Sequence, residues 1–402
     1  MGKAEPIRKS TKRRWPRRVA VAAAVLALGA GGAWYGVNHT AWMGPMLADG
    51  LRAVLGPRFV AWAEDTAYSL QDRVNRWRYK DEKPKTFWEA PTAVAIPTEA
   101  PAASAGTPAA MLFSPAGFSP PYAEVAATGD GVWAPIADAD EPSAPPLMFR
   151  TLVHPDPRRG FGALAVVALD RASLGLHLVA GTTEPESPRV HLKDRRGSIP
   201  PAHHAKLFAA FNGGFKATHG QFGMLLGGTE YLPPRDTSCT LVHYVDGRLA
   251  IAPWSVLKAG GIESMLFYRQ TPPCLVQDGE VDKTIESHGE YAKGWGATVS
   301  GETVIRRSAI GLSKDGHTLY YAIGDAMTAQ SLSRGMKAAG CHTAAELDVN
   351  YAYPRFLMYA KGEGAVPRAT QSLIPGVDFT KDQYVSPSPR DFFYVTRERK
   401  TL

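Results

Sequence analysis

Short apolar runs bounded by turn residues constrain the fold of this chain more than any other feature. They span residues 162–169, 174–179, 206–211, 240–245 and 319–323. Runs of this length and composition are typical of buried β-strands. The pairs Asp246-Gly247 and Asp315-Gly316 are typical of tight turns between paired strands. One helix is predicted from its cap at Thr328 to Ala339, and a crossover of this length permits parallel pairing. We therefore predict an α+β domain with a mixed, strand-rich sheet and few helices over residues 122–402.

The strand expected at residues 344–350 carries three polar side chains on one face. Side chains alternate along a strand, so Glu346, Asp348 and Asn350 should lie together, opposite the apolar residues between them. Such groups at the end of a buried strand are costly unless they are paired or have a function. A strand end whose polar groups face solvent is the structural alternative. We take Asp348 and Glu346 as candidate catalytic carboxylates and Asn350 as a candidate substrate contact.

Two further segments supply candidate substrate-binding residues. Asn212, Gly213 and Gly214 directly follow an apolar run, where paired glycines allow a sharp turn or close approach of a ligand. His219 lies in the glycine-rich stretch that follows and joins this set. Arg307 precedes an apolar strand and could bind a phosphate or carboxylate through its guanidinium. An ordinary turn and a solvated arginine are the respective alternatives. We expect Asn212, Arg307 and Asp348 to converge at one end of the sheet.

The positive charge of the chain is concentrated at its N-terminus. Residues 1–18 hold eight basic side chains and Glu5 alone, which accounts for the whole net charge of +7. The remaining 37 basic and 37 acidic residues balance, so no basic domain remains for nucleic acid. Residues 19–37 are uncharged and would span roughly 28 Å as a helix. We expect a cytoplasmic tail, a transmembrane anchor at 19–37, and the domain on the periplasmic or cell-surface side. A cleaved secretory signal, or a twin-arginine signal, is the alternative.

Two segments separate the expected anchor from the domain. Residues 45–79 show helical apolar spacing with a break at Gly56-Pro57, which predicts an amphipathic juxtamembrane segment. It could lie on the bilayer, pair with a partner, or pack on its own domain. Residues 80–121 are dense in Pro, Ala, Ser and Thr, which predicts an extended linker.

The three cysteines are odd in number and show no metal-binding spacing. A disulfide between Cys239 and Cys274 is permitted outside the cytoplasm, but buried free thiols are the expectation.

Taken in order, several segments resemble the phosphodiester glycosidase family. The resemblance rests on Asn212-Gly-Gly-Phe215, a strand ending in Gly279, Arg307-x-Ala-Ile-Gly311, the step Gly340-Cys341, and Leu347-Asp348. It covers about residues 160–359. Where the family pattern has Gly-Gly-Gly-Ser, this chain has Val349-Asn-Tyr-Ala352, and such side chains prevent close backbone contact with a ligand.

The resemblance implies a hydrolase that acts on a glycan-linked phosphodiester or glycosidic bond by carboxylate acid–base catalysis. Asp348 and Glu346 would supply the carboxylates, Arg307 would bind the phosphate, and Asn212 would orient the sugar. The two carboxylates could equally hold a divalent cation, so metal dependence stays open. The alternative is an inactive domain that binds envelope polysaccharide or a protein partner.

Overall fold

The computed structural model describes residues 19–22, 25, 29, 31–32, 56–90, 113–289, 294–295 and 303–398. The expected tail 1–18, most of the expected anchor 19–37, and residues 91–112 of the expected linker lie outside these ranges. Within them, no helix has both the length and the apolar character needed to cross a membrane. The chain divides into two compact units, residues 1–60 and 61–402, and the candidate site lies in the second.

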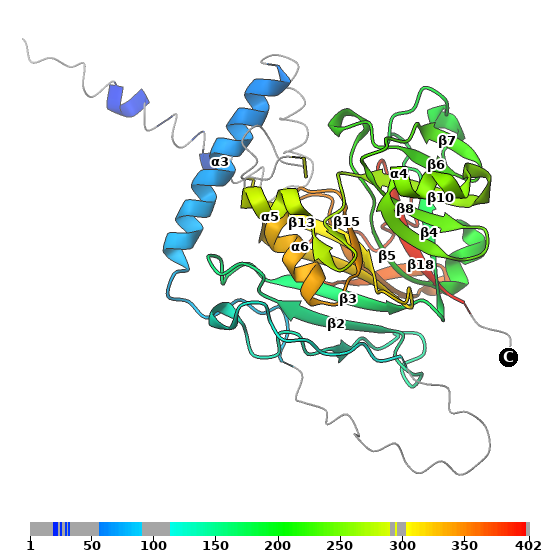
Figure 1. Ribbon diagram of the computed structural model, residues 1–402, viewed down its shortest axis with the longest axis horizontal. Coiled ribbons are helices and arrows are strands. Elements are labelled where there is room, and N and C mark those ends of the chain that lie inside the picture. Colours follow the sequence, from blue (N-terminus) through cyan, green and yellow to red (C-terminus); the bar gives the residue numbers. More distant parts are fainter. Residues whose placement is uncertain are drawn as a thin grey trace, which may run out of the picture. The chain divides into compact units, whose positions relative to one another are not determined.

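Three sheets form the second unit (Figure 1). The eight-stranded sheet has the order β1 (Ala134–Pro135), β2 (Met148–Val153), β3 (Leu164–Asp170), β14 (Thr318–Met327), β13 (Ile305–Leu312), β15 (Thr343–Glu346), β11 (Val276–Gln277), β12 (Glu280–Val281). One five-stranded sheet has the order β17 (Pro367–Ser372), β16 (Phe356–Lys361), β5 (Leu207–Asn212), β18 (Phe392–Arg397), β4 (Leu174–Val179). The other has the order β7 (Thr229–Leu232), β6 (Met224–Leu226), β10 (Met265–Thr271), β8 (Cys239–Tyr244), β9 (Leu249–Pro253). The prediction of a strand-rich α+β domain with few helices is confirmed.

The expectation of mixed pairing is wrong for the strand ladders of the described residues, which are all antiparallel. The crossover does connect two strands that run the same way, β14 and β15. Both strands pair with β13, which lies between them, so the two parallel strands do not hydrogen-bond to each other. The predicted turns at Asp246-Gly247 and Asp315-Gly316 do join antiparallel partners, β8 with β9 and β13 with β14.

The central core lies where the inner faces of the three sheets meet, with Val167 and Ile310 from the first, Phe211 from the second and Leu241 from the third. The opposite face of the eight-stranded sheet is covered by α5 (Lys283–His288) and α6 (Ala329–Ala338) (Figure 1). Burial of these faces is the main stabilising contribution and fixes the strand register.

The predicted helix after β14 is confirmed as α6. The Thr328 hydroxyl accepts a hydrogen bond from the Ser331 backbone N–H at 3.0 Å, and the Ser331 hydroxyl caps Thr328 in return. This reciprocal cap satisfies two N–H groups that an uncapped helix start would leave unpaired. Gly340, with φ of 98°, turns the chain back towards β15.

The helix before the domain, α3 (Pro57–Arg78), begins at the predicted break. Its second half contacts the strand-rich domain: Asp72 accepts two hydrogen bonds from the buried Arg159, at 2.7 Å each. Tyr68 also lies against Tyr351, with ring centroids 6.3 Å apart. These contacts favour packing on the chain's own domain among the three alternatives for this helix. At the ends of the expected linker, Trp88 and Phe118 likewise pack against the core clusters.

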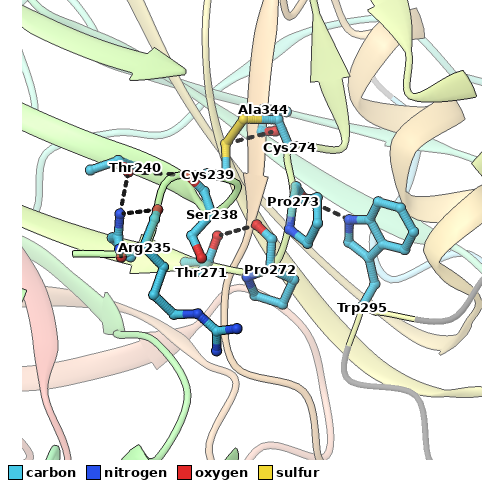
Figure 2. Close-up of a disulfide and its surroundings, with 11 residues drawn as sticks. Arg235, Ser238, Cys239, Thr240, Thr271, Pro272, Pro273, Cys274, Trp295 and Ala344 are labelled. Carbon is cyan, nitrogen blue, oxygen red and sulfur yellow. Dashed lines mark hydrogen bonds between the residues drawn. A yellow bond between two sulfur atoms is a disulfide. The ribbon is translucent and has the colours of Figure 1, made fainter. Parts of the chain in front are cut away.

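The expectation of three free thiols is wrong: Cys239 and Cys274 form a disulfide, and only Cys341 is a buried free thiol. The bond joins the start of β8 to the segment after β10, which the antiparallel pairing of the two strands brings together. Figure 2 shows the disulfide with Pro273 beside it, whose carbonyl accepts a 2.6 Å hydrogen bond from the Trp295 indole.

Candidate active site

The candidate site lies where the end of β5, strand β13 and the segment after β15 meet. The Asn212 side-chain amide donates a hydrogen bond to the Ser308 hydroxyl at 2.9 Å, and this hydroxyl donates to the Asp348 carbonyl at 3.0 Å. The Asp348 N–H donates to the Gly213 carbonyl at 3.1 Å. The structure therefore brings together Asn212, Gly213 and Asp348, which are separated along the sequence.

The Asp348 carboxylate is held by three donors. They are the Arg390 guanidinium at 2.7 Å, the Asn350 amide at 3.1 Å and the Val349 N–H at 3.0 Å. Arg390 in turn stacks over the Tyr353 ring at 4.4 Å. Burial opposes the arginine's charge, but the carboxylates of Asp348 and Asp391 outweigh it and raise the pKa of Arg390. These three contacts fix the orientation of the Asp348 carboxylate.

Gly213 and Gly214 let the backbone of this loop pack closely against a buried ion pair, and not against a ligand as expected. A Cβ on Gly213 would lie 2.3 Å from the Asp391 carboxylate, and one on Gly214 would lie 2.8 Å from the Arg269 guanidinium. Asp391 and Arg269 are both fully buried and pair at 2.8 Å. The Gly214 N–H also donates to the Asp391 carboxylate at 3.0 Å. The paired glycines thus fit this loop tightly around the ion pair.

Glu346 and Arg307 lie on the opposite face of the strands from Ser308. Side chains alternate along β13, so Arg307 points away from Asn212 and towards Glu346, with 2.6 Å between Nη1 and Oε1. All three guanidinium nitrogens donate within the protein, including to the carbonyls of Met327, Trp295 and Thr303. In this conformation Arg307 is not presented to a phosphate.

Glu346 has no exposed surface, and its Oε2 has no hydrogen-bond partner in the part of the chain that the structure describes. Burial raises the pKa of Glu346 to about 7, against the opposing effect of the Arg307 charge. The Glu346 carboxyl can therefore gain or lose a proton near neutral pH. A substrate could reach it only if the surrounding contacts opened.

The remaining candidates take different positions. All the hydrogen-bonding capacity of the Asn212 amide is used, because its oxygen accepts from the Tyr321 hydroxyl and the Arg355 N–H while its nitrogen donates twice. The Asn350 oxygen accepts from the N–H groups of Ala352, at the end of the segment 349–352 that replaces the glycine run, and of Tyr353 just after it, and so shapes this loop. His219 is solvent exposed in the short 3-10 turn Ala217–His219.

Sequence reasoning missed four side chains that organise this region: Ser308, Arg269, Arg390 and Asp391. Arg390 and Asp391 directly precede the apolar run of β18, and a pair of opposite charges at the start of a buried strand was the available signal. No local pattern marks Arg269, since its partner lies 122 residues away.

Metal binding stays a prediction. Across the ranges that the structure describes, no group of three or more His, Cys, Asp or Glu side chains is arranged to hold an ion.

Comparison with known proteins supports the sequence resemblance. Residues 205–348 match the family model described as Phosphodiester glycosidase. The matched range runs from just before Asn212 to Asp348 and so includes the ordered motifs. No curated protein matches the chain.

Two solved structures resemble the chain at low identity. One is the zebrafish N-acetylglucosamine-1-phosphodiester alpha-N-acetylglucosaminidase catalytic domain, auto-inhibited by its pro-peptide. It has 15% identity and a TM-score of 0.41 over 65% of this chain and 87% of that one. The other is a hypothetical protein from Synechocystis, with 10% identity and a TM-score of 0.38 over 64% of each chain. The assignment rests on the sequence match, in which residues 205–348 fit the family model for phosphodiester glycosidases.

Proposed function

We propose that this protein is a membrane-anchored, extracytoplasmic hydrolase that cleaves a glycan-linked phosphodiester or glycosidic bond. The family match over residues 205–348 carries the proposal. The Asp348 carboxylate, held by Arg390 beside the glycine loop, supports it from the structure. This carboxylate belongs to the retained Leu347-Asp348 pair of the family's final motif and directly precedes the replaced glycine run.

Such hydrolysis needs an acid to protonate the leaving oxygen and a base or nucleophile opposite it. Asp348 is the candidate base or nucleophile, because Arg390, Asn350 and the Val349 N–H hold its carboxylate in one orientation. Glu346, with its pKa near 7, is the candidate proton donor, and its use requires the Arg307 contact to open. Asn350 and His219 are candidate sugar contacts, because both are at least partly exposed.

The test is a hydrolysis screen of glycan phosphodiesters with the purified full chain and its Asp348→Asn variant. Asparagine keeps the shape and loses the charge, so we expect the rate to fall about a hundredfold or more. Asp246→Asn, in the exposed β8–β9 turn, is the matched control and should keep full activity. Full activity of Asp348→Asn would place the working carboxylate elsewhere.

A second function, glycan binding without hydrolysis, is favoured by one observation. The Asp348 residue is only 3% exposed, and the loop that follows carries Val349 and Tyr351 in place of glycines. Measurable glycan binding with no hydrolysis by the native chain would support this alternative.

The anchored topology rests on the basic tail and the apolar segment 19–37. A reporter that is active only in the cytoplasm, fused to the C-terminus, should give no signal. A strong signal would refute the topology, and a mature N-terminus near Trp34 would replace the anchor with a cleaved signal.

A further inference from the structure

A second site is suggested by an arginine that has no ionic partner among the described residues. Arg150, in β2, is half-buried, and within those residues its side chain shows one interaction, the stacking of its guanidinium over the Trp88 ring at 4.4 Å. Its Nε is buried without a hydrogen-bond partner in the described part of the chain. A buried N–H without an acceptor is costly, and the planar donors of the guanidinium match a carboxylate or a phosphate.

This arginine lines a pocket of about 420 Å³. The volume falls in the range of small-molecule sites, roughly 300–1,000 Å³. The pocket is bounded by Phe87, by Phe379 and by residues 370–377, and Arg150 is the only ionisable side chain among its described lining residues. Lys85 adds positive charge nearby, since its ammonium lies 5.7 Å from the centre of the Phe87 ring. The pocket is therefore electropositive with aromatic walls.

The polar wall of the pocket offers acceptors for hydroxyl groups. The Thr370 and Ser372 hydroxyls each donate to a backbone carbonyl, at 3.2 and 3.0 Å, which leaves their oxygens able to accept. The two phenylalanine rings provide apolar surface for the C–H face of a sugar ring. A ligand that matches these three features has a negative charge, hydroxyl groups and a flat apolar face, and an acidic sugar has all three.

The pocket is connected to the region around Asp348. Arg306 donates to the carbonyl of Gly376, in the pocket wall, at 3.3 Å, and to the carbonyl of Tyr351, in the replaced loop, at 2.8 Å. One guanidinium therefore bridges the pocket and the loop that follows Asp348.

We propose that this pocket binds an anionic saccharide residue, one that bears a carboxylate or a phosphate, next to the site around Asp348. Other flat anions would also match the charge and the aromatic walls, and the choice of a sugar among them rests on the proposed function. The anionic character follows from Arg150 and does not depend on hydrolysis.

The test is calorimetric or NMR-detected binding to the full chain. Glucuronic acid and its neutral methyl ester differ in charge at nearly equal shape, so we expect the acid to bind at least about tenfold more tightly. Glucose 6-phosphate compared with glucose tests the phosphate in the same way and identifies the preferred anion. In Arg150→Gln the preference for the anion should disappear. In the matched control Arg248→Gln it should persist, because Arg248 also stacks on a ring, Tyr244 at 4.1 Å, but lies in the β8–β9 turn and does not line the pocket.

Equal binding of acid and ester by the native chain would overturn the proposal, and this comparison needs no variant to fold. A preference that persists in Arg150→Gln, or benzoate binding as tightly as glucuronic acid, would overturn it as well. Arg150-dependent binding without any hydrolysis would support the proposed pocket and refute the proposed hydrolase function. Hydrolysis without Arg150-dependent binding would support the hydrolase function and refute the pocket.

Discussion

The buried pair of Arg269 and Asp391 should control both the stability of the domain and the shape of the glycine loop. Both side chains have no exposed surface, and their Nε and Oδ2 atoms are 2.8 Å apart. At an effective dielectric constant of about 20, two charges at this distance attract by about 6 kcal/mol. Asp391→Asn removes the negative charge and leaves the buried guanidinium uncompensated. We expect a loss of about 3–5 kcal/mol in the free energy of unfolding.

Urea unfolding followed by tryptophan fluorescence measures this loss. With a slope of about 3 kcal/mol per molar urea, the midpoint should fall by about 1–1.7 M. The control is Glu280→Gln, which breaks the Lys337–Glu280 pair, whose side chains are 42% and 74% exposed. That variant should lose less than about 1 kcal/mol.

The loop connection is tested by a double-mutant cycle with Arg269→Met. Because the two side chains are in contact, the cycle should show a coupling energy of at least about 1 kcal/mol. A loss below about 1 kcal/mol in Asp391→Asn, or additive losses in the cycle, would falsify the idea that this pair organises the Gly213-Gly214 loop.

Three further predictions follow from single contacts. Folding raises the pKa of Glu346 from 4.5 to about 7. The folded state therefore binds this proton more tightly than the unfolded state, and the stability that this gives should be full below pH 4.5 and lost as the pH rises to 7. The loss is on the order of 3 kcal/mol, and urea unfolding across this range should show it in the native chain and not in Glu346→Gln. Cys239→Ser combined with Cys274→Ser should cost about 4 kcal/mol, given the sequence separation of 35, and a loss under about 1 kcal/mol would contradict this. Arg159→Met should loosen α3, seen as faster limited proteolysis within that helix, and unchanged cleavage would refute its anchoring role.

The sequence by itself determined the local features of the domain. Strand positions such as β4 at 174–179 follow from apolar runs between turn residues, and these signals lie within a few residues of one another. The same holds for α6, whose cap at Thr328 and stop at Gly340 are local hydrogen-bonding and backbone requirements. The order of the family motifs is likewise a property of the linear chain, and the match to residues 205–348 confirms it.

Only the tertiary structure decided which charged groups meet. Asp348 pairs with Arg390, 42 residues further on, because the start of β18 lies beside the end of β5. The strand expected at 344–350 ends at Glu346, so strand alternation does not extend to Asp348 and Asn350, and Glu346 is turned to Arg307 and away from Asn212. Strand order and antiparallel pairing set these neighbours through burial of whole sheet faces, and no short segment contains that information. For the same reason the pairing of Cys239 with Cys274 was open in the sequence and became definite when β8 and β10 were placed side by side.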